Sequence, residues 1–154
     1  MPKEPAAVQA ESGQRPHDAT ATIARALDVW NNRLGRQFGP LSRPQRRALR
    51  TLHELSSAKP PVRVSDLAER LGVTSAGATR MLSKLEDFGY INRVRVPEGD
   101  QREVFVALTA SGAQALSAAN AVYFDRVGRE LHRLDQAEQE MLAHLLEKLT
   151  SVDE

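Results

Sequence analysis

The sequence predicts a mainly α-helical fold that contains one small β-hairpin. Two observations support this prediction. Apolar residues recur at steps of three and four along most of the chain, as they do on one face of a helix. Only the segment around residues 93–108 changes to an alternating pattern, which is typical of strands. The chain has 154 residues, 41% of them hydrophobic but only 5% aromatic, so we expect one domain with an aliphatic core over residues 20–154.

Residues 1–19 are expected to form a flexible tail. They are rich in small and polar residues, and the three prolines Pro2, Pro5 and Pro16 argue against the alternative, a helix that a partner stabilises. From residue 20 to about residue 38 the pattern predicts a helix, whose apolar stripe is formed by Ile23, Leu27, Trp30, Leu34 and Phe38. Gly39 and Pro40 are expected to end it.

Capping residues indicate where the next three helices begin. Ser42 and Gln45 form a capping box at the start of a second helix, which the run 56–61 ends. Ser65 is expected to cap a short third helix, and Gly72 breaks the chain after it. Thr74 or Ser75 then caps a fourth helix that reaches about Phe88 and stops at Gly89.

The alternating segment predicts the hairpin and is followed by two more helices. Val94 and Val96 lead into a turn at residues 97–101, and the returning strand alternates with Val104, Val106 and Leu108 on one side. Thr109 is expected to cap a long fifth helix, with either Val122 or Tyr123 in its apolar stripe. Asp135 and Glu138 form the capping box of the last helix.

The third and fourth helices form a helix-turn-helix, and the hairpin makes this a winged helix at about residues 42–108. A projection at 100° per residue places Ala78, Met81, Leu82, Leu85 and Phe88 on the inner side of the fourth helix. The outward residues are small, hydroxylated or basic, as a helix that enters a DNA groove requires: Ala76, Thr79, Arg80, Ser83 and Lys84. Thr74 and Ser75 at its start suit a phosphate. The alternative is an ordinary surface helix.

Charge is distributed unevenly along the chain. Residues 1–102 hold 17 basic against 11 acidic residues, and residues 103–154 hold 4 against 9. Six arginines and no acid lie between residues 33 and 50. Arginines at the start of a helix oppose its dipole, which phosphate contacts offset, so Arg46 is a candidate DNA contact. A solvated helix face is the alternative for this run.

The run VSDLAERLGVTSAGATRMLSKLEDFGYINRVRVPEGDQREVFVALTASG resembles the winged helix of the MarR family of bacterial transcriptional regulators. The match includes the family's Asp-x-Arg in the wing, here Asp100 and Arg102, and the flanking helices extend it over about residues 20–150. Arg102 at a hairpin tip suits a minor groove, and Asp100 can hold it extended. Arg93 or Arg95 is then expected to be a phosphate neighbour. The alternative is a local ion pair that stabilises the turn.

The first helix and the last two have apolar stripes outside the compact winged helix. A second copy of the chain is the simplest partner for them, through residues about 20–38 and 109–152. The candidate dimerisation residues are Ile23, Leu27, Leu131, Leu142, Leu145 and Leu149. The resemblance implies the same dimer, with two recognition helices in successive major grooves of a near-palindrome.

The resemblance also implies a small aromatic or phenolic anion as effector, for which Trp30, Arg33 and Tyr123 are the candidate pocket residues. Core packing is the alternative for the tryptophan. Because the chain has no cysteine, disulfides, thiol catalysis and thiol-based sensing are excluded. The four histidines are scattered and no phosphate loop or nucleophile elbow is present, so we expect no enzyme activity, no cofactor and no metal.

Together these observations predict a homodimeric regulator that recognises double-stranded DNA by sequence and acts as a repressor. The alternative is a winged-helix module that docks to proteins without specific DNA binding. No stretch is apolar enough to span a membrane, and the first residues lack the apolar core of a secretion signal. We therefore expect a cytoplasmic protein that associates with the nucleoid when it binds DNA.

Overall fold

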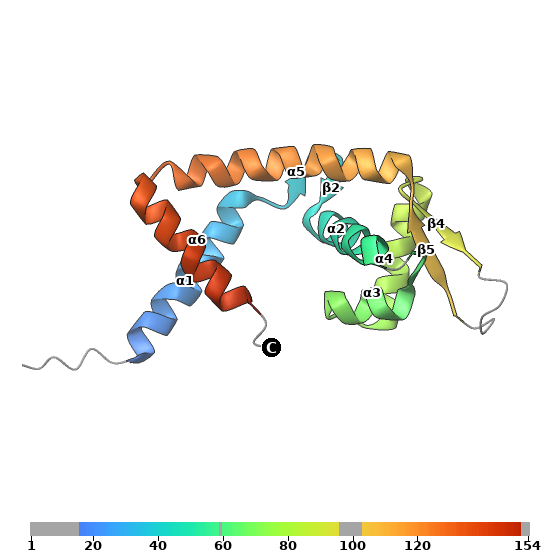
Figure 1. Ribbon diagram of the computed structural model, residues 1–154, viewed down its shortest axis with the longest axis horizontal. Coiled ribbons are helices and arrows are strands. Elements are labelled where there is room, and N and C mark those ends of the chain that lie inside the picture. Colours follow the sequence, from blue (N-terminus) through green and yellow to red (C-terminus); the bar gives the residue numbers. More distant parts are fainter. Residues whose placement is uncertain (1–15, 59, 96–102, 152–154) are drawn as a thin grey trace, which may run out of the picture. The chain divides into compact units, whose positions relative to one another are not determined.

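The computed structural model describes residues 16–58, 60–95 and 103–151 (Figure 1). The chain divides into two compact units, Met1–Gly35 and Arg36–Glu154. In the described part, the first unit contains helix α1 (Pro16–Leu34), and the second contains the remaining helices and two small sheets. The predicted fold class, mainly helical with a small antiparallel sheet, is confirmed.

Helix α1 differs from the prediction at both ends. It begins at Pro16, so residues 16–19 are helical and not part of the tail; a proline is tolerated in the first turn because the N–H it lacks would have no partner there. It ends at Leu34, since Gly35 adopts φ +79°. Phe38, which the apolar stripe placed on this helix, lies beyond it in a strand.

A two-stranded ladder leads into the second helix. Strands β1 (Gln37–Phe38) and β2 (Leu41–Ser42) pair antiparallel around Gly39, which adopts φ +54°. The side chain of Phe38 is fully buried. The backbone N–H of Ser42 donates to Gln45 Oε1 at 2.8 Å, and the Gln45 N–H donates to Ser42 Oγ at 3.4 Å. The predicted capping box is thus confirmed at the start of α2 (Arg43–Ala58).

The helix-turn-helix consists of α3 (Val64–Leu71) and α4 (Ser75–Asp87). Gly72 ends α3 in the left-handed conformation, and Thr74 caps α4 by accepting a hydrogen bond from the Gly77 N–H, as predicted. The predicted cap at Ser65 is wrong. Strand β3 (Val62–Arg63) delivers the chain directly into α3, so Arg63 occupies the cap position without a side-chain bond, and the Ser65 hydroxyl donates to Asp66.

The wing has more strands than the sequence indicates. Strands β4 (Ile91–Val94) and β5 (Phe105–Leu108) form the predicted hairpin, and β3 pairs with the other edge of β5. Val104 lies outside the strand and is exposed, contrary to the expected alternation. Phe105 is buried beside Val106, and the Arg63 guanidinium lies 5.7 Å from the Phe105 ring centroid. Val96 lies outside the described residues.

Two helices complete the second unit. Thr109 caps α5 (Ala110–Leu131) through the Gly112 N–H at 3.0 Å, and Asp135 and Glu138 form the capping box of α6 (Gln136–Thr150); both were predicted. The Gln139 side chain donates to the carbonyls of Leu131 and Leu134 and so ties α6 to the end of α5. None of the helices in the described ranges is long and apolar enough to cross a membrane.

The core lies where α2 packs against α3, α5 and the strand β5 (Figure 1). Its fully buried members come from every one of these elements and include Leu49, Leu52, Leu67 and Val106. Val122 and Tyr123, the two alternatives for the α5 stripe, both pack against this core. Phe88, predicted on the inner side of α4, is 60% exposed; it follows the last residue of the helix and stacks on Tyr90, with 5.6 Å between ring centroids.

Candidate nucleic-acid interface

The outward face of α4 is exposed as the helical projection predicts. Ala76, Thr79, Arg80 and Lys84 are exposed, together with Thr74 and Ser75 at the start of the helix, while Ser83 is half-buried. Among the described residues, Arg80 and Lys84 have no ion-pair partner. Two positive charges one helical turn apart are therefore available to a polyanion on this face.

The hydroxyl groups on this face bond back to the helix itself. Thr79 Oγ1 donates to the Ser75 carbonyl at 2.9 Å, and Ser83 Oγ donates to the Thr79 carbonyl at 3.0 Å. Because its hydroxyl proton is engaged, Thr79 presents acceptor lone pairs to a ligand, whereas Ser83 Oγ also accepts from Arg93 Nη2 and keeps one lone pair. Acceptors on a recognition helix pair with the amino groups of adenine and cytosine in the major groove.

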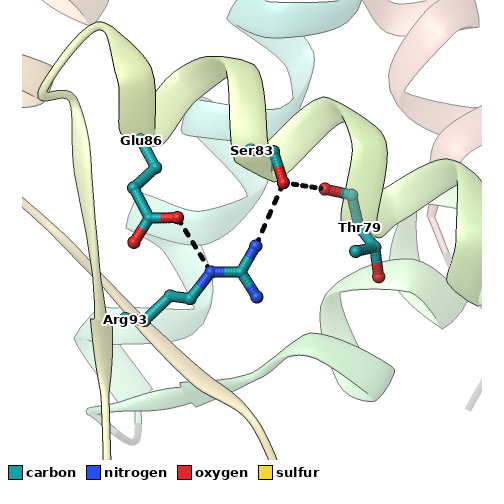
Figure 2. A network of polar contacts seen from close by, with 4 residues as sticks. All are labelled: Thr79, Ser83, Glu86 and Arg93. Atoms are coloured by element: carbon teal, nitrogen blue, oxygen red, sulfur yellow. Dashed lines mark hydrogen bonds and ion pairs between the residues drawn. The ribbon is translucent and has the colours of Figure 1, made fainter.

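The wing is joined to this face by Arg93. Its Nε donates to Glu86 Oε2 at 2.8 Å and its Nη2 donates to Ser83 Oγ at 3.1 Å (Figure 2). Arg93 was predicted as a phosphate neighbour, and the structure places its guanidinium beside α4. The partner Glu86 was missed. Ser83 and Glu86 stand three residues apart on one helix face, which was the only local signal for such a partner.

A hollow of about 380 Å³ separates α4 from the start of α3 and the returning strand. Arg63 and Arg93 line it, with Ser75, Thr79 and Glu103 among its other lining residues. Arg63 Nη1 lies 3.1 Å from Glu103 Oε1, so a second ion pair joins the end of β3 to the residues just before β5. The hollow between recognition helix and wing therefore carries both signs of charge, beside the apolar side chains of Val64, Leu82 and Val104.

The structure does not support Arg46 as a DNA contact. Its side chain is only 6% exposed, and its Cζ lies 3.7 Å from the ring centroid of Tyr123. Its Nε donates to Asn120 Oδ1 at 2.9 Å, and desolvation lowers its pKa from the ordinary value. The guanidinium is thus engaged between α2 and α5, and we remove it from the interface. The acid-free run of arginines carried no sign of this aromatic partner.

The three candidate pocket residues come from different parts of the chain. Trp30 and Arg33 lie on α1 in the first unit, and Tyr123 lies on α5 in the second. Tyr123 packs edge-on against Phe38 at 5.5 Å between centroids. Arg126, which the sequence did not single out, donates to the Gln37 carbonyl at 2.8 Å and lies 5.2 Å from the Phe38 ring. The ligand pocket stays a prediction.

The wing tip belongs to the part of the chain that is not described. Arg95 is exposed at the last residue before the gap, whereas Asp100 and Arg102 lie within residues 96–102, outside the described ranges. In the described part, no group of three or more histidine or acidic residues has the arrangement of a metal site.

The candidate dimerisation residues are apolar and largely uncovered. Ile23, Leu27, Leu145 and Leu149 are exposed, and Leu131 and Leu142 are half-buried. Helix α6 has no buried residue along its length. A whole helix with exposed leucines is unusual in an isolated protein and is typical of an interface.

Comparisons with known proteins agree with this geometry. The MarR family model matches residues 41–104, from β2 to the residue before the returning strand β5. An uncharacterized HTH-type transcriptional regulator of Mycobacterium bovis is 31% identical over 131 residues, which cover 81% of this chain and 88% of the relative.

Solved structures match along nearly the whole length. A Mycobacterium tuberculosis MarR family protein, solved in complex with DNA, superposes with a TM-score of 0.69 at 29% identity and covers 86% of this chain and 97% of that one. A Bordetella bronchiseptica protein whose DNA binding is regulated by 6-hydroxynicotinic acid has a TM-score of 0.68 at 17% identity, with 87% and 99% covered, and shows the shared fold. The chain therefore belongs to the MarR family of DNA-binding transcriptional regulators.

Proposed function

We propose that this chain binds double-stranded DNA sequence-specifically, as a homodimer on a pseudo-palindromic operator, and that it represses transcription there. The observation that carries the proposal is the outward face of α4. It combines the exposed cations Arg80 and Lys84 with small residues and with hydroxyls that present acceptors. Small side chains let a helix approach base edges closely, and the cations neutralise phosphate. Such a regulator works where the chromosome is, in the bacterial cytoplasm.

Fluorescence anisotropy tests the DNA-binding part. Duplexes from the promoter region next to its own gene are compared with random duplexes at several stated salt concentrations. We expect Arg80→Ala to weaken operator binding by about tenfold, the cost of a lost base contact, and Lys84→Ala to weaken all duplexes alike. Arg102→Ala at the wing tests the predicted minor-groove contact in the same assay.

The matched control is Arg70→Ala. Arg70 is an exposed arginine on α3 and does not lie on the outward face of α4. Its replacement removes the same charge from the protein without changing that face. Operator affinity no better than that for random DNA, and equal in Arg80→Ala, Arg102→Ala and Arg70→Ala, would overturn the proposal. If the chain shows no operator preference and another protein co-purifies with it, the result would favour the docking module.

The proposed dimer rests on the apolar faces of α1, α5 and α6. In the described part, Ile23, Leu27, Leu145 and Leu149 are exposed, and a second copy would bury them. The acidic second half of the chain suits a platform that stays away from DNA. Two copies would place their recognition helices about one helical turn apart, which accounts for a near-palindromic operator.

We propose a small aromatic or phenolic anion as effector, with Trp30, Arg33 and Tyr123 as the candidate contact residues that the sequence offers. The regulation of the Bordetella bronchiseptica protein by 6-hydroxynicotinic acid supports this class of ligand. Trp30 is the only tryptophan, so its fluorescence reports directly on the site. Titration of the full chain with 6-hydroxynicotinic acid and other aromatic carboxylates should quench Trp30 and release operator DNA, and Arg33→Ala should abolish both effects. No quenching by any aromatic anion would contradict the proposal.

A further inference from the structure

Arg93 joins the wing to the recognition helix at the surface that is proposed to meet DNA. Arg93 of β4 reaches back to Glu86 and Ser83 of α4 (Figure 2). We infer that Glu86 is a positioning residue for DNA recognition, which holds Arg93 across α4 and thereby keeps the wing at a set orientation to the recognition helix. This inference rests on the proposed sequence-specific DNA binding.

The geometry of the contact is that of a two-point clasp. Arg93 Nε donates to the Glu86 carboxylate at 2.8 Å, and Nη2 donates to the Ser83 hydroxyl at 3.1 Å. Ser83 in turn donates to the Thr79 carbonyl at 3.0 Å, so the chain of bonds ends on the helix backbone. A planar guanidinium held at two of its nitrogens cannot rotate freely. The side chain of Arg93 is therefore ordered before DNA arrives.

The position of this ion pair argues for a role in geometry and against one in folding stability. The Arg93 and Glu86 side chains are 38% and 37% exposed, and exposed ion pairs are screened and contribute little to folding. A carboxylate beside a face that meets phosphates also repels DNA. Its presence there is accounted for if its charge is used to direct Arg93.

The clasp leaves part of Arg93 available to DNA. A guanidinium has five N–H donors, of which the described residues engage two. The remaining donors can reach a phosphate oxygen without losing Glu86. Ordering the side chain in advance lowers the entropy cost of that contact. Because α4 reads the major groove and the wing follows the backbone beside it, a fixed angle between them lets both bind only when the bases beneath α4 are in register.

The test compares Glu86→Gln with the matched control Asp87→Asn. Asp87 is the adjacent, exposed residue of α4, it loses the same charge, and in the described part of the chain it has no ion-pair partner. The Kd of each full-length variant is measured for an operator duplex, selected from a random pool by the wild-type protein, and for a random duplex, over a series of salt concentrations.

Both substitutions remove a negative charge, so both should tighten binding to the random duplex. We expect the preference for operator over random DNA to fall about fivefold in Glu86→Gln and to stay unchanged in Asp87→Asn. An equal preference in the two variants would overturn the inference. So would a salt slope that rises by about one in Glu86→Gln with the preference unchanged, because Arg93 would then be a generic phosphate contact that Glu86 merely masks.

A second variant keeps the charge of the wing. Arg93→Lys retains the cation but cannot bond two groups through a planar fork, so it should lose operator preference as Glu86→Gln does. The double variant should lose little more than either single one, because both remove the same clasp. Additive losses would contradict the clasp. A wild-type protein without operator preference would instead overturn the proposed function, which separates the two failures.

Discussion

The guanidinium of Arg46 lies over the ring of Tyr123, with 3.7 Å between Cζ and the ring centroid, and its Nε donates to Asn120 at 2.9 Å. This contact joins α2, which packs against the helix-turn-helix, to α5. A cation at this depth is stable because the aromatic face and the amide oxygen replace its water shell. Among the described residues, every buried polar side-chain atom has a hydrogen-bond partner.

Replacing Arg46 should destabilise the fold. We expect Arg46→Ala to lower the free energy of unfolding by about 2 kcal/mol, since it removes a desolvated cation–π contact and leaves Asn120 without its donor. Urea denaturation measures the change. The control Arg47→Ala, at the next and exposed position of α2, should stay within about 0.5 kcal/mol of wild type.

The direction of the Arg46 pKa shift determines how the stability change of Arg46→Ala depends on pH. Desolvation lowers the pKa of Arg46 in the folded state, so its charged form costs stability until the pH rises toward that pKa. An arginine stays protonated at ordinary pH in both states. The difference between wild type and Arg46→Ala should therefore be constant between about pH 6 and pH 9. A difference that varies across this range would assign the effect to another group.

Gly112 is expected to tolerate no side chain. It lies in the first turn of α5, where the Tyr90 carbonyl approaches so closely that an added Cβ would overlap its oxygen. The same carbonyl accepts from the Thr109 N–H at 3.1 Å, so it cannot move away cheaply. Gly112→Ala should cost about 2 kcal/mol or more of folding free energy, measured by thermal unfolding.

Gly128 provides the matched control for that substitution. It lies in the same helix, and an added Cβ there meets nothing within 4 Å. Gly128→Ala should raise the stability by about 0.5–1 kcal/mol, because alanine is the better helix former. Equal effects of the two substitutions would contradict the close approach at Tyr90.

Thr74 is expected to couple the stability of α4 to DNA binding. Its hydroxyl accepts from the Gly77 N–H at 3.1 Å and caps the recognition helix. Thr74→Ala should lower the unfolding free energy by about 1 kcal/mol and weaken operator binding, because the first turn of α4 frays. Thr74→Ser keeps the hydroxyl acceptor, so its unfolding free energy and its operator affinity should both be close to those of the wild type. Loss of binding in Thr74→Ser with intact stability would instead assign the threonine methyl group to a DNA contact.

A charge on the exposed face of α6 should disrupt the proposed dimer. Leu145 is 48% exposed, and Leu145→Glu would place a carboxylate in an apolar interface. Sedimentation of the full chain should then show monomers, and operator affinity should fall. His144→Glu adds a similar charge at the next, exposed position and should leave the dimer intact. Dimers in both variants would place the interface elsewhere.

Much of the fold was predictable because the signals are local. The capping residues Ser42, Thr74, Thr109 and Asp135 bond to N–H groups within three residues, so their roles depend on little beyond the adjacent sequence. The errors lie where a local pattern does not show the boundary or the presence of an element. Phe38 continues the helical spacing of α1, yet it lies in a strand, because the positive φ of Gly35 ends the helix first. Strand β3 has two residues, too few to show a period.

The candidate site also contains residues that were predictable from local spacing and contacts that were not. The outward face of α4 follows from helical geometry, so Arg80 and Lys84 were predicted from spacing and are exposed. The partners of Arg46 and Arg93 were not predictable. Arg46 bonds to a residue 74 positions away, and Arg93 reaches from a strand to a helix. Such contacts depend on how two elements pack, and the spacing of residues within either segment does not encode that packing.

The sequence by itself determined the helix-turn-helix and wing, the outward face of α4 and the uneven charge of the two halves, because periodicity, caps and composition act within one segment. Only the tertiary structure decided what each arginine does. It placed Arg46 between α2 and α5 and Arg93 against Glu86, and it left Arg80 exposed. The reason is physical. A guanidinium can bind an aromatic ring, a carboxylate or a phosphate, so its role is set by which of these the packing brings within reach.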